Sequence, residues 1–198
     1  MARQLAPAEV GDTPMVWPVA SHVVLGHGKV SDFVNDSVLT PDGGRMERQY
    51  TLHPGAVGVI AWDDADRIAV VRQYRHPVGF QLTEPPAGLL DAEGETWLSA
   101  AQRELAEEAG LFHLERHPLK PAGQVRTARL EAEGWHDEVL HVFNLTLSGE
   151  FVPSNQDGEV AEFMCLSAAE TLARIDAGAF TVDATQTLVQ GLRALKRG

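Results

Sequence analysis

The feature that most constrains this chain is a run of acidic residues in the middle of the sequence. Glu104, Glu107 and Glu108 lie three and four positions apart, so an α-helix would gather all three carboxylates on one side. In such a helix Glu104 and Glu108 point within about 40° of each other. Like charges this close repel one another unless a cation neutralises them. Carboxylate oxygens are hard ligands that suit Mg²⁺ or Mn²⁺, so the spacing predicts a helix that holds a divalent metal.

The residues around the acids favour the same helix. Apolar residues recur at helical spacing on the face that we predict to lie opposite the carboxylates and to pack on a core. These residues are Leu98, Ala101, Leu105 and Ala109. Thr96 can cap the start of the helix. Gly88, Asp91 and Gly94 suit a tight loop before it, whose backbone carbonyls could supply further oxygen ligands.

This layout resembles the sequence signature of the Nudix hydrolases. That signature runs Gly, five residues, Glu, seven residues, then Arg-Glu-hydrophobic-any-Glu-Glu-any-Gly-hydrophobic. The positions that match at the family's spacing are Glu95, Arg103, Glu104, Leu105, Glu107, Glu108, Gly110 and Leu111. The front differs, because six residues separate Gly88 from Glu95, which lengthens the loop and leaves the helix intact. The alternative interpretation is an ordinary solvated acidic helix face, and the number of matched positions counts against it.

The resemblance implies a metal site and the residues around it. Glu104, Glu107 and Glu108 would hold Mg²⁺ or Mn²⁺, and the carbonyl of Ala87 would complete the coordination shell. Arg103 would orient the neighbouring carboxylates, and we count Arg103 and Glu104 among the catalytic residues.

Within that family, the flanking segments resemble the ADP-ribose pyrophosphatases. The similarity rests on Gln-Tyr-Arg-His at 73–76 and on Glu-Pro-Pro-Ala-Gly at 84–88. It implies that Arg75 grips a phosphate or the terminal ribose, that Glu84 contacts the substrate, and that Arg48 of a partner subunit lies near the adenine. An arginine can bind phosphate through two nitrogens and stack its flat face on a base. The implied reaction is hydrolysis of ADP-ribose to AMP and ribose 5-phosphate.

The general base would come from a loop beyond the acidic helix. Glu138, which precedes an expected strand, is our choice, and Asp137 and Glu159 are its rivals. Three other functions stay open. The first is a Nudix hydrolase acting on a nucleotide sugar, a dinucleotide or a nucleoside triphosphate. The second is a Nudix-like module that binds ADP-ribose without cleaving it, and the third is a structural protein with an acidic helix.

Alternating apolar residues and turn signals predict an α+β fold. The expected strands cover residues 22–25, 30–40, 45–53, 56–62, 67–74, 80–84, 118–125, 138–147 and 160–166, and two helices follow Ser167 and Asp183. The resemblance implies that these elements form a mixed α/β/α sandwich, the Nudix fold. We divide the chain into residues 1–54, a tail and a small antiparallel β-subdomain that serves as a dimerisation arm, and residues 55–198, the hydrolase domain.

Composition limits the partners. The net charge of −12 across 198 residues, without a basic stripe, argues against a nucleic-acid polymer, and we expect a small-molecule nucleotide substrate and a homodimer. No apolar run approaches the roughly 18 residues of a membrane span, and the first residues lack the apolar core of a signal peptide, so we expect a cytoplasmic protein. The single cysteine, Cys165, excludes an internal disulfide and is predicted to be a buried thiol.

Overall fold

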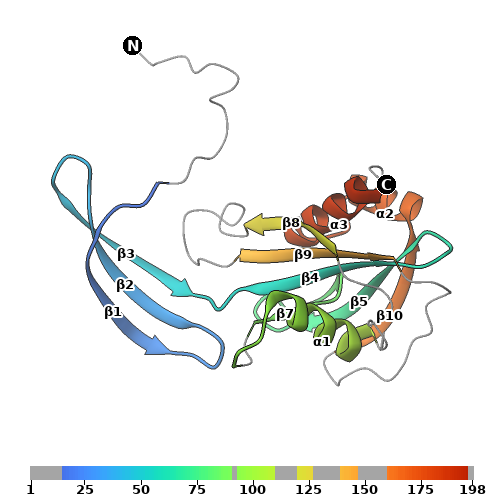
Figure 1. The fold of residues 1–198 in the computed structure, drawn as a ribbon, viewed down its shortest axis with the longest axis horizontal. Helices are drawn as coiled ribbons and strands as arrows, with labels where there is room; N and C mark the ends of the chain where they lie inside the picture. Colours follow the sequence, from blue (N-terminus) through green and yellow to red (C-terminus); the bar gives the residue numbers. More distant parts are fainter. Residues whose placement is uncertain (1–14, 91–92, 110–119, 127–138, 147–159, 196–198) are drawn as a thin grey trace, which may run out of the picture.

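The structure is a computed structural model, and it describes residues 15–90, 93–109, 120–126, 139–146 and 160–195. These residues form two β-sheets and three helices (Figure 1). The α+β class predicted from the sequence is confirmed.

The first sheet is a meander of three antiparallel strands, as predicted. Its strands are β1 (Val19–His27), β2 (Asp32–Leu39) and β3 (Arg45–Leu52), in that order. Buried Asp36 at the centre joins all three strands, because His22 bonds to its Oδ1 at 2.5 Å and the Tyr50 hydroxyl donates to its Oδ2 at 3.0 Å. Figure 1 shows this sheet apart from the rest of the molecule. The division of the chain at residue 54 stays a prediction.

The second sheet has seven strands. They are β4 (Ala56–Trp62), β5 (Arg67–Arg75), β6 (Phe80–Glu84), β7 (Ala87–Leu89), β8 (Lys120–Arg126), β9 (Val139–Thr146) and β10 (Val160–Ser167). The main order is β10-β5-β4-β9-β8, with β4 and β9 parallel, while β6 pairs with β5 and β7 pairs with β4.

The sheet splits between two of its central strands. β4 and β5 pair only at Trp62 and Ile68, next to their connecting turn. Farther along, β5 pairs with β6 and β4 pairs with β7, so the two strands diverge. Pro85 and Pro86 carry the chain from β6 to β7 across this split, and prolines suit such a place because they cannot donate ladder hydrogen bonds.

Helices cover both faces of this sheet, which gives the three layers of the predicted sandwich (Figure 1). α1 (Trp97–Ala109) covers one face, and α2 (Ala168–Asp176) and α3 (Val182–Leu195) cover the other. Every residue of β4 is buried, and its side chains alternate between the two cores, as the period of two in a strand requires. Val57 and Val59 pack with Leu105 of α1, whereas Ile60 packs with Leu188 of α3.

Two further sequence expectations concern individual features. Cys165 is half-buried and packs against the core on the α1 side, where burial raises the pKa of its thiol. Within the described part of the chain, no helix combines the length and the apolar character needed to cross a membrane.

A buried carboxylate organises the turn between β4 and β5. Asp63 is 1% exposed and accepts hydrogen bonds from the backbone N–H groups of Ala65 and Arg67, and its Oδ2 lies 2.6 Å from Nη2 of Arg67. Burial opposes ionisation, but the hydrogen bonds from the Arg67 side chain, the Arg67 backbone and the Ala65 backbone outweigh it. The pKa of Asp63 therefore lies below its ordinary value.

We expect Asp63→Asn to lower the free energy of unfolding at pH 7 by about 1–3 kcal/mol, because charged hydrogen bonds are lost. A carboxylate with a lowered pKa stabilises the fold fully above its unfolded pKa of about 3.9 and stops doing so as the pH falls through its folded pKa. The deficit of the variant should therefore shrink in acid. Denaturant unfolding at pH 7 and under acidic conditions measures it, and Asp64→Asn, at the exposed neighbouring position, is the control. A deficit that does not change with pH would contradict this role for the Asp63 charge.

Candidate functional site

The first turn of α1 fixes where the acidic helix begins. Thr96 caps the helix as predicted, since the Ser99 N–H donates to the Thr96 hydroxyl at 3.1 Å and the Thr96 N–H donates to the Ser99 hydroxyl at 2.8 Å. Trp97 stacks on His141 of β9, with ring centroids 3.8 Å apart. Burial of the His141 ring lowers its pKa. The start of α1 is thus held against the sheet.

Two of the three carboxylates of α1 lie against strand β7. Glu104 and Glu108 are only 8% and 4% exposed. A Cβ atom built on Gly88 would overlap the carboxylate of Glu104, so this carboxylate lies directly over the Gly88 backbone. Glu108 accepts a hydrogen bond from the Ala87 N–H at 2.9 Å. Glu107 points outward, with its side chain about half exposed.

This arrangement corrects the prediction that the carboxylates lie opposite the apolar stripe of the helix. Leu98 is 43% exposed, whereas Ala100, Ala101 and Leu105 are buried. At 100° per residue, Glu108 lies within about 20° of Ala101, so Glu104 and Glu108 share the buried side with the stripe, and Glu107 alone lies opposite it. Leu98 lies just beyond the edge of that buried side.

Arg103 connects the loop to the helix. Its guanidinium donates to both carboxylate oxygens of Glu95, at 2.9 and 3.1 Å, and to the carbonyl of Leu89 at 2.9 Å. Its Nη1 donates to Glu104 at 2.5 Å and to Glu107 at 3.2 Å. The hydrogen bond with Glu95 is the main reason that the pKa of Arg103 rises above its already high ordinary value, although burial opposes the rise. The predicted orienting role of Arg103 is consistent with these contacts.

The acidic cluster carries more negative than positive charge. Three carboxylates, from Glu95, Glu104 and Glu107, bond to the guanidinium of Arg103, and that of Glu108 lies against β7 as Glu104 does. Among the described residues no three acidic, histidine or cysteine side chains converge as a metal-binding group, and Arg103 bonds to three of the acids. The donor chemistry nevertheless fits a hard divalent cation, because the donors are oxygens and two of the carboxylates are buried next to the backbone of β7.

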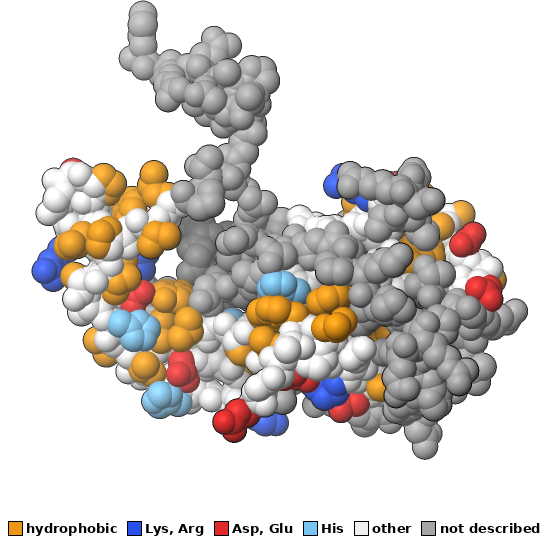
Figure 2. Space-filling view, in the orientation of Figure 1, with side chains coloured by type: hydrophobic (Ala, Val, Ile, Leu, Met, Phe, Trp, Pro, Cys, Tyr) orange, Lys and Arg blue, Asp and Glu red, His pale blue; other side chains and the backbone are white. Residues whose placement is uncertain are grey.

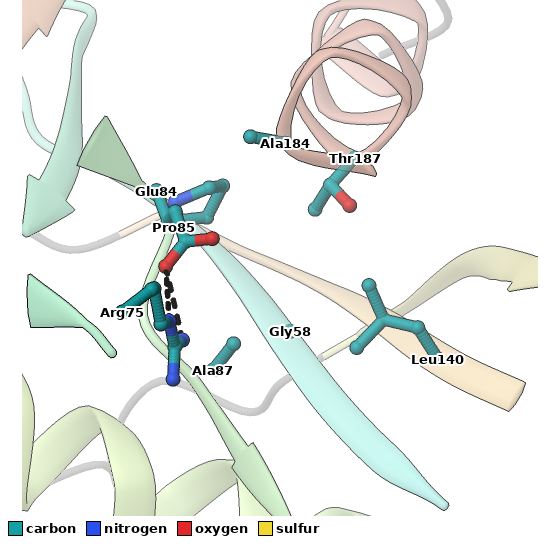
Figure 3. Close-up of a pocket in the computed structure, with 8 residues that line it drawn as sticks. All are labelled: Gly58, Arg75, Glu84, Pro85, Ala87, Leu140, Ala184 and Thr187. Carbon is teal, nitrogen blue, oxygen red and sulfur yellow. Dashed lines mark hydrogen bonds and ion pairs between the residues drawn. The ribbon is translucent and has the colours of Figure 1, made fainter. Parts of the chain in front are cut away.

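A second ion pair lies where β4 and β5 diverge. Arg75, at the end of β5, donates through Nε and Nη2 to Oε2 of Glu84, at 3.0 and 2.9 Å. Figure 3 shows a guanidinium nitrogen pointing away from Glu84, while the other carboxylate oxygen points toward a cavity beneath α3. Ala87 lines the same cavity, so Arg75 and Glu84 lie beside the acidic cluster.

Several residues of this cavity were not predicted from the sequence. They are Gly58, Leu140, Ala184 and Thr187. A lone glycine inside an apolar strand can mark a close approach of another group, and Gly58 carried that signal. Nothing in the sequence marked the others, because they meet only when β4, β9 and α3 pack together.

Two more predicted site residues are Arg48 and Glu138. Arg48 is exposed on β3 of the three-stranded sheet, where its Nη1 donates to the Glu47 carbonyl at 3.2 Å. Glu138, the predicted base, lies outside the described residues, as do its rivals Asp137 and Glu159. These assignments stay predictions.

The acidic helix packed on β7 within an α/β/α sandwich is the arrangement that the Nudix resemblance implies. The model of the NUDIX domain matches residues 52–185, and the chain therefore belongs to the Nudix family.

Individual relatives narrow the comparison. The chain is 39% identical over 126 residues to an ADP-ribose pyrophosphatase of Mycobacterium tuberculosis, and the aligned segment covers 64% of this chain and 58% of the relative. It is 38% identical over 116 residues to an ADP-ribose pyrophosphatase of Bacillus subtilis, where the aligned segment covers 59% of this chain and 58% of the relative. The chain thus spans less than two thirds of the length of these relatives. The crystal structure of an ADP compounds hydrolase shares the fold, with a TM-score of 0.70 over 94% of this chain and 97% of that chain, at 16% identity.

Proposed function

We propose that this protein is a metal-dependent pyrophosphohydrolase that cleaves ADP-ribose to AMP and ribose 5-phosphate. The observation that carries the proposal is the cluster of carboxylates around Arg103, packed on β7 next to the Arg75–Glu84 pair. The relatives named ADP-ribose pyrophosphatase support the choice of substrate. A diphosphate carries negative charge that an acidic site can accept only together with cations.

The residues of α1 would hold that cation. Glu104, Glu107 and Glu108, with the carbonyl of Ala87, are the proposed ligands, and Mg²⁺ or Mn²⁺ suits them. When bound, such a cation supplies charge neutralisation for the diphosphate oxygens and activation of a water. Arg103 keeps Glu104 in place. Arg75 can offer a phosphate the guanidinium nitrogen that points away from Glu84.

Glu138 is proposed as the general base that removes the proton from the attacking water. We expect Glu138→Gln to lower kcat by about 10²-fold or more while KM changes little, because a base acts mainly in the transition state. Steady-state kinetics with ADP-ribose measures both constants. Asp137→Asn and Glu159→Gln are the comparison variants, and an unchanged kcat for Glu138→Gln would move the role to one of them.

The three-stranded sheet is proposed to form a homodimer in which Arg48 of the partner subunit reaches the adenine. Many apolar side chains of this sheet are exposed, as Figure 2 shows in orange, and exposed apolar patches mark association surfaces. They include Val19, Val23, Val24, Leu25, Phe33, Leu39, Met46 and Leu52. We expect sedimentation equilibrium to give twice the chain mass of 21.5 kDa, and Phe33→Glu with Val23→Glu to give the monomer mass. A monomeric wild-type protein would contradict the dimer.

The activity is tested with a panel of ADP-ribose, a nucleotide sugar, a dinucleotide and a nucleoside triphosphate, each with Mg²⁺. We expect the highest kcat/KM for ADP-ribose, with AMP and ribose 5-phosphate as products, and loss of turnover when the metal is chelated. If another compound is cleaved faster, that compound replaces ADP-ribose as the proposed substrate. Binding of ADP-ribose without cleavage of any compound would instead support the binding module.

A further inference from the structure

The split between β4 and β5 leaves a cavity beneath α3 (Figure 3). Its volume is about 60 Å³, room for roughly four to six waters or for part of a ring. The described residues of its wall are Gly58, Arg75, Glu84, Pro85, Ala87, Leu140, Ala184 and Thr187. Ala87 also donates to Glu108 of the acidic cluster. The cavity therefore opens beside the place proposed for the diphosphate, on the opposite side of the sheet from α1.

The charges around the cavity disfavour a phosphate inside it. Among the described residues of the wall, Arg75 and Glu84 are the charged ones, and they neutralise each other. The Glu84 oxygen that is not bonded to Arg75 points into the cavity (Figure 3), where it would repel an anion and accept a hydrogen bond from a hydroxyl or amino group. The other wall residues that the structure describes have apolar side chains or none, apart from the Thr187 hydroxyl. An uncharged ring that carries hydrogen-bond donors matches this lining.

We propose that this cavity binds the uncharged ring next to the scissile diphosphate, and that Gly58 and Thr187 set the size of the ring that fits. The proposal rests on the proposed function, because it assigns one end of the same substrate. Glu84 is the hydrogen-bond acceptor for that ring, and Arg75 contacts the phosphate side.

The size limit follows from Gly58. A Cβ atom added to Gly58 would lie 3.6 Å from both Leu140 Cδ1 and Thr187 Cγ2. These are ordinary van der Waals distances, so Gly58→Ala fits without moving its neighbours. The added methyl group would occupy space in the cavity and would shorten it. Thr187→Ser removes the facing methyl group and would restore part of that space.

Calorimetric binding of AMP and of ribose 5-phosphate, each with Mg²⁺, tests the proposal separately from turnover. We expect Gly58→Ala to raise the Kd of one product about tenfold, the effect of a single methyl-sized change in an apolar pocket, and to leave the other within about twofold. The product affected identifies which ring occupies the cavity. Thr187→Ser in the Gly58→Ala background should recover part of the affinity, and Thr185→Ser, on the same helix but outside the cavity wall, should leave both Kd values unchanged.

The proposal is overturned if neither Kd changes in Gly58→Ala, if both rise equally, or if the wild-type protein binds neither product. Thermal unfolding of each variant detects loss of fold. Cleavage of ADP-ribose by the wild-type protein is measured in parallel. If the wild-type protein shows no turnover but Gly58→Ala still changes one Kd selectively, the proposed reaction is rejected and the ring-binding cavity is kept.

Discussion

Replacing Glu108 by glutamine is expected to lower kcat for ADP-ribose by about 10³-fold while leaving the fold intact. Glu108 is 4% exposed and accepts the Ala87 N–H at 2.9 Å. The glutamine side chain has the same size and a carbonyl oxygen that can accept that bond. What is lost is one negative charge of the acidic cluster, and with it a proposed metal ligand.

Steady-state kinetics over a range of Mg²⁺ concentrations, together with circular dichroism during thermal unfolding, measures the effect of Glu108→Gln. The matched control is Glu162→Gln, because Glu162 is an exposed acid of β10 paired with Arg72 at 3.0 Å, outside the acidic cluster. We expect the control to keep wild-type kcat. Wild-type turnover in Glu108→Gln itself would remove Glu108 from the proposed metal ligands.

Gly88→Ala is expected to lower kcat/KM by about 10²-fold, because the ligand geometry of a catalytic site tolerates little displacement. The added Cβ would overlap the Glu104 carboxylate, so either Glu104 or strand β7 must move. Glu104 is also bonded to Arg103, so its displacement would disturb the whole cluster. We also expect a loss of about 1–3 kcal/mol in the free energy of unfolding from the added bulk.

Denaturant unfolding and kinetics with ADP-ribose measure both consequences of Gly88→Ala. Gly26→Ala adds the same methyl group to a strand where nothing lies within 4 Å, and it should be close to wild type in both assays. A Gly88→Ala enzyme with full activity would mean that the position of Glu104 over β7 is not needed for catalysis.

The elements with strong local signals could be predicted from the sequence. The acidic helix, its Thr96 cap and the three antiparallel strands before it depend on residues close together in the chain. The capping box of α2 is equally local, because Ser167 and Glu170, three positions apart, exchange hydrogen bonds at the start of the helix expected after Ser167. Such features follow from periodicity and capping preferences that a single sequence carries.

Features that depend on packing between distant segments could not be predicted. The burial of Glu104 and Glu108 follows from where β7 meets α1, and nothing in the helix itself determines that. Residues 56–62 and 67–74 were rightly expected to be strands, but the short turn between them gave no sign that β4 and β5 would separate beyond the Trp62–Ile68 pair. Thr187 joins the cavity for the same reason, since α3 reaches β4 only in the packed structure.

The complete burial of β4 has a consequence for how this protein could change its substrate in evolution. Specificity that resides in surface loops can change at little cost to stability. Here Gly58, in the wall of the cavity, belongs to a strand whose neighbouring residues fill both hydrophobic cores. Substitutions along this strand that reshape the cavity would also alter close-packed cores, and such changes are destabilising. We therefore expect natural variation in specificity to arise first on α3, at positions such as Ala184.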